Sequence, residues 1–180
     1  MKFTEQRMKG VFLIEAEPFV DNRGAFRRHF CQDEFREQGL NNRVVQANIS
    51  ENFHAYTLRG FHYQLKPYQE AKTLSCLSGK IYDIVVDLRK ESTTFMQWIS
   101  VELSKENRRS LHIAPGCANA FITLEDHTML HYYHSEKYTP GYESGIRYND
   151  PAFDFKWPVE PRIISEKDMN HPDFDINKFR

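Results

Sequence analysis

A histidine follows a glycine by two residues in the segment Arg59–Gln64, which reads Arg-Gly-Phe-His-Tyr-Gln. The segment is predicted to be a strand, and side chains alternate between the two faces of a strand, so Gly60 and His62 should share one face while Arg59 lies on the other. Gly60 would let a ligand approach the backbone closely. An imidazole titrates near neutral pH, which suits it to moving protons. His62 is therefore a candidate for acid–base chemistry, and the alternative is a hydrogen-bonded histidine of the core.

A metal centre is the second chemistry that His62 could support, since jelly-roll proteins often hold a metal with several histidines and a carboxylate. Such a site would need further histidines, and the sequence lacks them at the two expected positions. Gln64 occurs after His62 where a second histidine would be needed, and Asn119 occurs after Pro115-Gly116 where another commonly completes the site. A metal-dependent oxygenase would require a bound metal ion. We therefore expect no metal and favour proton transfer.

The composition is typical of a globular protein that binds a small molecule. The 180 residues include 14 Phe and 9 Tyr, and 40% are hydrophobic, which excludes disorder and suits half-buried strands. The net charge is -1 and no long run of Lys or Arg occurs, so neither nucleic acid nor a membrane is an expected partner. The three cysteines lack CxxC spacing and the first residues lack an apolar targeting segment, so we expect free thiols and a cytoplasmic location.

The elements that must position His62 are predicted to be strands. Short runs of β-branched and aromatic residues alternate with turn residues at intervals of about eight to twelve residues. No helical stretch is long enough for a parallel crossover, so residues 1–180 should form one all-β domain, an antiparallel jelly roll. A short surface helix is expected at Gln32–Gly39, and the tail from Pro140 should wrap irregularly. The strands are expected at Val11–Glu15, Val44–Ile49, Thr57–Gln64, Lys72–Leu77, Ile81–Leu88, Trp98–Leu103, Leu111–Ile113, Asn119–Leu124 and Thr128–His134.

Six segments of the chain occur in the order and at the spacing of a known family. They are Asp21–Phe26, Gln46–Asn48, Leu58–Gln64, Val86–Lys90, Gly145–Pro151 and Ile164–Asp168. Through them most of the chain resembles the nucleotide-sugar epimerases typified by dTDP-4-dehydrorhamnose 3,5-epimerase. The resemblance implies a cupin-like antiparallel jelly roll with a short surface helix and an irregular C-terminal wrap, a homodimer that shares strands, and no cofactor.

The resemblance also implies a reaction: inversion of C3, C5 or both in a nucleoside-diphospho-4-keto-6-deoxy sugar, for bacterial surface polysaccharide. Such a reaction needs a base, a group that stabilises the enolate, and an acid on the opposite face of the ring. His62 resembles the base, and Asp168 the carboxylate that orients it. Lys72 resembles the cation that faces the enolate oxygen, and Tyr132 the acid, whereas Tyr133 should face away. Considered alone, Lys72 could be a surface residue and Tyr132 a core residue.

A second group of residues resembles the family's nucleotide-binding positions. Arg23 and Arg59 match diphosphate ligands, because guanidinium groups fit phosphate oxygens, and Arg23 would serve the neighbouring subunit's site. Two amides on one strand face could bind a pyrimidine edge, and an aromatic ring could stack on the base. The amides are Gln46 and Asn48, the ring is Phe26, and the remaining matches are Tyr138, Glu143 and Lys167.

The chain departs from the family's pattern at two positions. Arg28 occupies a position near the nucleobase where members usually carry glutamate, and this reversed charge leaves both dTDP- and CDP-linked sugars open. Asn119 occurs where typical members have histidine. Asparagine carries no charge, so stabilisation of the enolate would depend more on Lys72. The choice among C3, C5 and both therefore stays open.

Two other functions are compatible with the same fold. A nucleotide-sugar ketoisomerase would also use His62, but it would move the carbonyl between carbons. A non-catalytic carbohydrate-binding jelly roll would lack the acid or the base, whereas candidates for both are present here.

Overall fold

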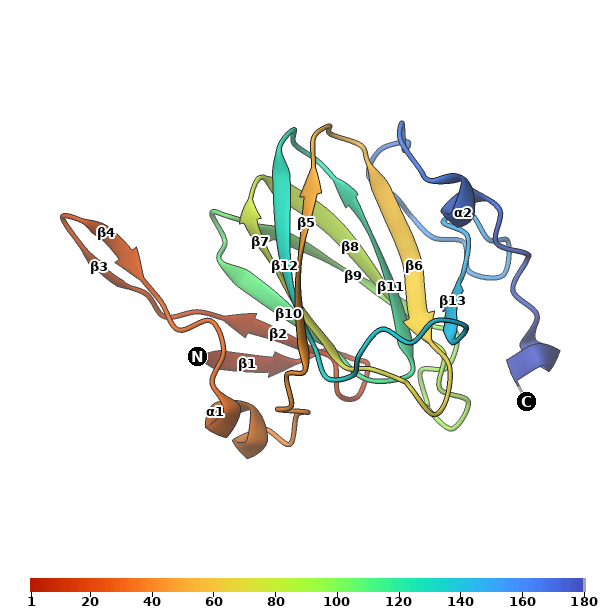
Figure 1. Ribbon diagram of the computed structural model, residues 1–180, viewed down its shortest axis with the longest axis horizontal. Helices are drawn as coiled ribbons and strands as arrows, with labels where there is room; N and C mark the ends of the chain where they lie inside the picture. The colour runs from red at the N-terminus through yellow and green to blue at the C-terminus, as the bar shows by residue number, and fades with distance from the viewer. Residues whose placement is uncertain (180) are drawn as a thin grey trace.

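Two antiparallel β-sheets face each other and form a jelly roll (Figure 1). The computed structural model describes residues 1–179. The larger sheet has the strand order β1-β2-β10-β7-β12-β5, the smaller sheet has the order β13-β6-β11-β8-β9, and β3 and β4 pair separately. The strands are β1 Lys2–Glu5, β2 Phe12–Glu15, β3 Phe19–Asp21, β4 Gly24–Phe26, β5 Gln46–Asn52, β6 Leu58–Gln64, β7 Lys72–Ser78, β8 Lys80–Asp87, β9 Trp98–Ser104, β10 Arg109–Ile113, β11 Cys117–Thr123, β12 Thr128–His134 and β13 Glu143–Gly145. The helices are α1 Gln32–Glu37, α2 Glu166–Met169 and a 3-10 helix Ile176–Phe179.

The predicted all-β jelly roll is confirmed, and every predicted strand corresponds to an observed one. The strand ends differ by at most three residues, and the predicted surface helix is α1. The missed strands are β1, β3, β4 and β13, each of only three or four residues. They are mostly exposed or half-buried, so burial imposes little alternation on them. No helix within residues 1–179 has the length and apolar character needed to cross a membrane.

Strand β8 is buried on both of its faces. Ile81 and Val85 point into the core between the sheets, whereas Ile84 and Val86 pack into a second apolar cluster on the outer face of the smaller sheet. The C-terminal segment forms the outer part of that cluster: Phe155 stacks on Phe61 with ring centroids 4.3 Å apart. The predicted wrap is therefore a packed layer, because it covers an apolar surface that a single sheet would leave in water.

The strand β6 contains a bulge at Gly60 that changes which side chains share a face. Arg59 pairs with Phe121 and His62 with Asn119, so two residues of β6 oppose a single residue of β11. Arg59 and His62 consequently both line the cavity between the sheets. The prediction that they lie on opposite faces is wrong, because the bulge adds one residue to the simple alternation.

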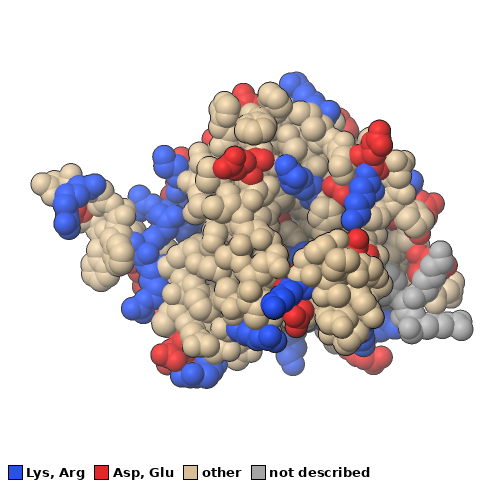
Figure 2. Space-filling model, in the orientation of Figure 1, with Lys and Arg blue, Asp and Glu red and all other residues tan. Residues whose placement is uncertain are grey.

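The hairpin β3–β4 forms an arm that extends away from the two sheets (Figure 1). Its apolar side chains are exposed to solvent, with 80% of Phe19 and 76% of Phe26 accessible. Figure 2 shows Lys and Arg side chains gathered along the arm and at its junction with the body. Exposed aromatic rings beside basic groups are typical of a surface that contacts another molecule.

Replacing Gly60 by alanine should destabilise the fold strongly. Gly60 has φ +111, and a Cβ there would lie 2.6 Å from the Asn119 carbonyl oxygen. Backbone strain and overpacking together should lower the free energy of unfolding by about 3 kcal/mol in urea denaturation. Gly39→Ala is the matched control, because Gly39 has φ +69 with open space around it, and it should cost only about 1 kcal/mol. Equal losses in the two variants would show that close approach at Gly60 is unimportant.

Candidate functional site

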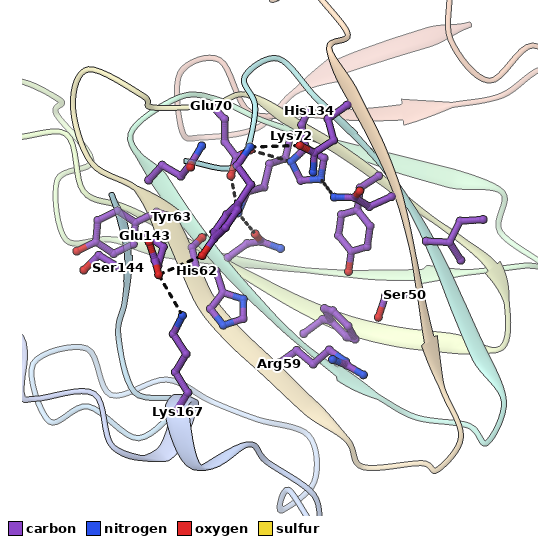
Figure 3. Close-up of a pocket in the computed structure, with 18 residues that line it drawn as sticks. Ser50, Arg59, His62, Tyr63, Glu70, Lys72, His134, Glu143, Ser144 and Lys167 are labelled. Carbon is purple, nitrogen blue, oxygen red and sulfur yellow. Dashed lines mark hydrogen bonds and ion pairs between the residues drawn. The ribbon is translucent and has the colours of Figure 1, made fainter. Parts of the chain in front are cut away.

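A cavity of about 540 Å³ lies between the sheets, lined by β5, β7 and β12 on one side and by β6 and β11 on the other. Figure 3 shows the lining side chains converging on it. Most of the residues proposed from the sequence meet here, although they come from distant parts of the chain. They are Gln46, Asn48, Arg59, His62, Lys72, Asn119, Tyr132, Tyr138, Glu143 and Lys167.

The imidazole of His62 is held by a carboxylate from the far end of the chain. His62 Nε2 lies 2.7 Å from Asp168 Oδ1, and the Gly60 amide donates to Asp168 Oδ2 at 3.1 Å. Asp168 is placed by α2, whose first turn is capped by Ser165. Burial raises the pKa of Asp168, but the hydrogen bonds from His62, Gly60 and Ser165 outweigh it and hold that pKa below its usual range. Nε2 therefore donates to an ionised carboxylate, and Nδ1 is the nitrogen left to accept a proton.

Lys72 extends into the cavity beside His62. Its Nζ donates to the His62 carbonyl oxygen at 2.9 Å and lies 3.5 Å from Asn119 Oδ1. The Asn119 amide donates in turn to Asp83 Oδ2 at 3.0 Å. Burial raises the pKa of Asp83 to about 8, although Asn119 and Lys72 oppose the shift. Asp83 is therefore mostly protonated at neutral pH, and the positive charge beside Asn119 is that of Lys72.

Tyr132 lies on the opposite wall from His62. It is part of β12, where it pairs with Asn48 of β5, and it lines the cavity together with Ser50. Burial raises the pKa of Tyr132 above its usual value, so the phenol holds its proton firmly. The neighbouring Tyr133 packs against Phe30 with ring centroids 5.3 Å apart, and it does not line the cavity. The two adjacent tyrosines thus face opposite sides of the sheet, as alternation predicts.

Polar groups line the part of the cavity near Tyr138. The Tyr138 amide donates to Gln46 Oε1 at 3.2 Å, and the Tyr138 hydroxyl donates to Glu143 Oε1 at 3.1 Å. Lys167 lies 3.8 Å from the same carboxylate. Arg59 uses its Nε to donate to Asn52 at 2.7 Å, which leaves its terminal nitrogens for an anion. These groups can bind a charged, hydrogen-bonding ligand.

Four residues proposed from the sequence do not line the cavity of their own chain: Asp168, which contacts His62, and three residues in or next to the arm. Arg23 and Phe26 belong to the arm, and Arg28 follows it. Arg23 pairs with Asp21 in the hairpin turn, and Arg28 pairs with Glu34. The single chain therefore does not bring these three residues to the site.

The sequence prediction omitted Glu70, His134, Ser50 and Asp83, all of which contribute to the site. Glu70 Oε2 lies 2.8 Å from His134 Nδ1, and both residues line the cavity. His134 could have been found by alternation, because it lies two residues after Tyr132 on the same strand. Glu70 lies just before β7, outside any strand, so no alternation pattern identifies it. No three His, Cys, Asp or Glu side chains in the described chain are grouped so as to hold a metal ion.

The chain is similar to proteins of one family along nearly its whole length. Residues 5–175 match the sequence model of a family described as dTDP-4-dehydrorhamnose 3,5-epimerase. An enzyme of that name from Methanothermobacter thermautotrophicus is 41% identical over 172 residues, which cover 94% of this chain and 92% of the relative.

Solved structures of related enzymes have the same fold. A dTDP-4-dehydrorhamnose 3,5-epimerase from Bacillus anthracis with TDP and PPi bound has a TM-score of 0.93 and 36% identity, with 96% of this chain and 99% of that chain covered. A 3'-monoepimerase from Streptomyces bikiniensis in complex with dTDP-quinovose has a TM-score of 0.87 and 31% identity, with 93% and 85% covered.

Replacing Asp83 by asparagine should stabilise the protein increasingly as the pH rises. The folded state retains the Asp83 proton up to a pH of about 8, whereas the unfolded chain releases it near a pH of about 4. The unfolding free energy of the wild type therefore decreases as the pH rises from about 4 to about 8. The asparagine variant does not titrate at this position, so it lacks this decrease. The measurement is the unfolding free energy of Asp83→Asn minus that of the wild type, from urea denaturation. This difference should increase by about 1 kcal/mol or more when the pH is raised from about 5 to about 8.

Asp87→Asn is the matched control for this measurement. Asp87 lies on the same strand, and although burial raises its pKa, hydrogen bonds from Arg89, Ser92 and Thr94 lower it to about 2. The Asp87 carboxylate is ionised throughout the tested range, so the cost of its replacement should not change with pH there. A pH-independent difference for Asp83→Asn would contradict the protonated state of Asp83.

Proposed function

This chain belongs to the dTDP-4-dehydrorhamnose 3,5-epimerase family and is an epimerase of nucleotide-linked 4-keto sugars, and we propose that His62 and Tyr132 are its base and its acid. The observation that carries the proposal is the His62–Asp168 contact of 2.7 Å, which orients a proton acceptor on the wall facing Tyr132. A carboxylate that holds one imidazole nitrogen stabilises the positive charge formed when the other takes a proton.

In the first step, His62 Nδ1 removes the proton from the carbon beside the ketone. The C–H bond breaks, the proton becomes the N–H of an imidazolium, and the electron pair moves onto the carbonyl oxygen as an enolate. Lys72 supplies the positive charge that faces this oxygen, because its ammonium lies between the backbone of His62 and the side chain of Asn119. The neutral Asn119 adds no charge of its own.

In the second step, Tyr132 returns a proton to the opposite face of the same carbon. The phenol O–H bond breaks and a new C–H bond forms as the enolate collapses to the ketone. Its raised pKa keeps the phenol protonated until the strongly basic enolate carbon is present. Exchange of protons with solvent then returns His62 and Tyr132 to their starting states.

The nucleotide is proposed to bind along Arg59, Gln46, Asn48 and the group formed by Tyr138, Glu143 and Lys167. The terminal nitrogens of Arg59 suit a diphosphate, and the amides suit a pyrimidine edge. The relatives from Bacillus anthracis and Streptomyces bikiniensis are bound to TDP and dTDP-quinovose. A dTDP- or CDP-linked sugar is the proposed substrate.

A homodimer is proposed to complete the nucleotide site. The arm exposes Phe19 and Phe26 on either side of a turn that carries the exposed Arg23. Placing this arm against a second chain would bury the aromatic rings and bring Arg23, Phe26 and Arg28 to the neighbouring cavity.

Replacing His62 by alanine should greatly slow proton removal. In deuterated water with dTDP-, CDP- and GDP-linked 4-keto sugars, the wild-type enzyme should place deuterium at C3, C5 or both while the ketone stays in place. His62→Ala should slow this incorporation by about 10²–10⁴-fold. His131→Ala is the control, because His131 lies on the same strand as Tyr132 but outside the cavity. Exchange at the wild-type rate in His62→Ala would reject the base, and a displaced ketone would indicate a ketoisomerase.

Replacing Tyr132 by phenylalanine should separate inversion from proton removal. The base and the enolate site remain, so deuterium should still enter with retained configuration, whereas inversion should slow by about 10²-fold or more. Product NMR reports both rates on one sample. Tyr133→Phe changes the adjacent tyrosine on the other face and should leave both rates intact. If Tyr132→Phe inverts at the wild-type rate, another group is the acid.

A further inference from the structure

The ammonium of Lys72 is surrounded by acceptors from the protein itself. Its Nζ lies 2.9 Å from the His62 carbonyl oxygen, 3.4 Å from Glu70 Oε1 and 3.5 Å from Asn119 Oδ1. The contacts with His62 and Asn119 are hydrogen bonds that the ammonium donates, and the contact with Glu70 is an ion pair. The one charged acceptor is Glu70, and its carboxylate opposes the positive charge that the enolate requires.

Glu70 is shared between Lys72 and His134. Its second oxygen lies 2.8 Å from His134 Nδ1, a shorter contact than the 3.4 Å to Lys72 (Figure 3). All three side chains are mostly buried, with 9 to 12% of each exposed. Burial raises the pKa of Glu70, but its contacts with His134 and Lys72 hold it below its usual range. An ionised carboxylate is thus held between two donors and lies closer to the imidazole.

His134 is held in place on both sides of its ring. It is the last residue of β12, where it pairs with Lys72 of β7 and with Gln46 of β5, and it lines the cavity. Its Nδ1 donates to Glu70, and Nε2 lies 3.2 Å from the Asn48 amide nitrogen, which donates to it. The ring also lies nearly parallel to Tyr132, at 23°. These contacts fix the distance at which the imidazole holds the carboxylate.

We propose that His134 holds Glu70 back from Lys72, so that the ammonium keeps its positive charge available for the enolate oxygen. Without the imidazole, the Glu70 carboxylate would be free to close on Lys72 to the distance of about 2.8 Å typical of a direct ion pair. That contact would offset the positive charge of Lys72. The effect would be large, because interactions between charges are strong in a buried site of low dielectric constant. Glu70 and His134 are positioning residues, and their role rests on the proposed function of Lys72.

Replacing His134 by leucine tests this proposal, because leucine fills similar space but cannot donate to Glu70. The rate of deuterium incorporation at saturating substrate should fall by about tenfold or more, with a smaller change in KM, since an interaction with the enolate is weakened. Glu70→Gln should exchange at least as fast as the wild type, because the opposing charge is removed. The double variant Glu70→Gln with His134→Leu should recover to within about threefold of Glu70→Gln alone.

Recovery in the double variant is the result that a purely structural role for His134 does not produce. Circular dichroism and thermal unfolding should show that each variant is folded. His134→Asn, which is too short to hold Glu70, replaces His134→Leu should the latter not fold, with the same expected rates. A double variant as slow as the single His134 variant, or a Glu70→Gln variant that is itself slow, would overturn the proposal.

Lys72→Met distinguishes this inference from the function on which it rests. If Lys72→Met exchanges deuterium at the wild-type rate, the proposed role of Lys72 fails, and the inference fails with it. If Lys72→Met is slow and the double variant does not recover, the proposed function stands and only the role of His134 and Glu70 is rejected. In a Lys72→Met background, adding His134→Leu should cause no further loss.

Discussion

Inverting a carbon centre requires that a proton leave from one side and return from the other, and the two facing sheets provide those two sides. His62 projects from β6 of the smaller sheet, and Tyr132 projects from β12 of the larger one, into the same cavity. Side chains on one face of a single sheet all point in one direction, so one sheet could not surround the sugar. The space between the sheets is therefore the proposed reaction site, and the distance between the two sheets of the jelly roll sets its width.

The proposed base, His62, is oriented by a contact between two segments that are far apart in the sequence. Asp168 is 106 residues from His62, and it reaches the imidazole only because the C-terminal segment packs over the outer face of the smaller sheet. The bulge at Gly60 serves the same contact, since the Gly60 amide binds the second oxygen of the carboxylate. The aromatic layer around Phe155 thus supports the orientation of the proposed base as well as the stability of the fold.

The neutral side chain of Asn119 lies between a cation and a buried acid. The Asn119 amide joins Lys72 to Asp83, and burial keeps Asp83 mostly protonated. Lys72 is then the cation beside this amide. The Glu70 carboxylate partly offsets its charge, and the same carboxylate also contacts His134. Buried charges are tolerated only when they are paired, so the proposed stabilisation of an enolate depends on how the Glu70 carboxylate is shared between Lys72 and His134.

The sequence by itself determined the strands of the two sheets except the short β1 and β13, because burial imposes a period of two or a continuous apolar run on the longer strands. Its motifs also identified the family and most residues that line the cavity. Only the tertiary structure placed Arg59 and His62 on one side of β6, and only it joined Glu70 to His134 across 64 residues. The physical reason is that periodicity reports the burial of each strand separately, whereas bulges, register and contacts between strands are decided when the sheets assemble.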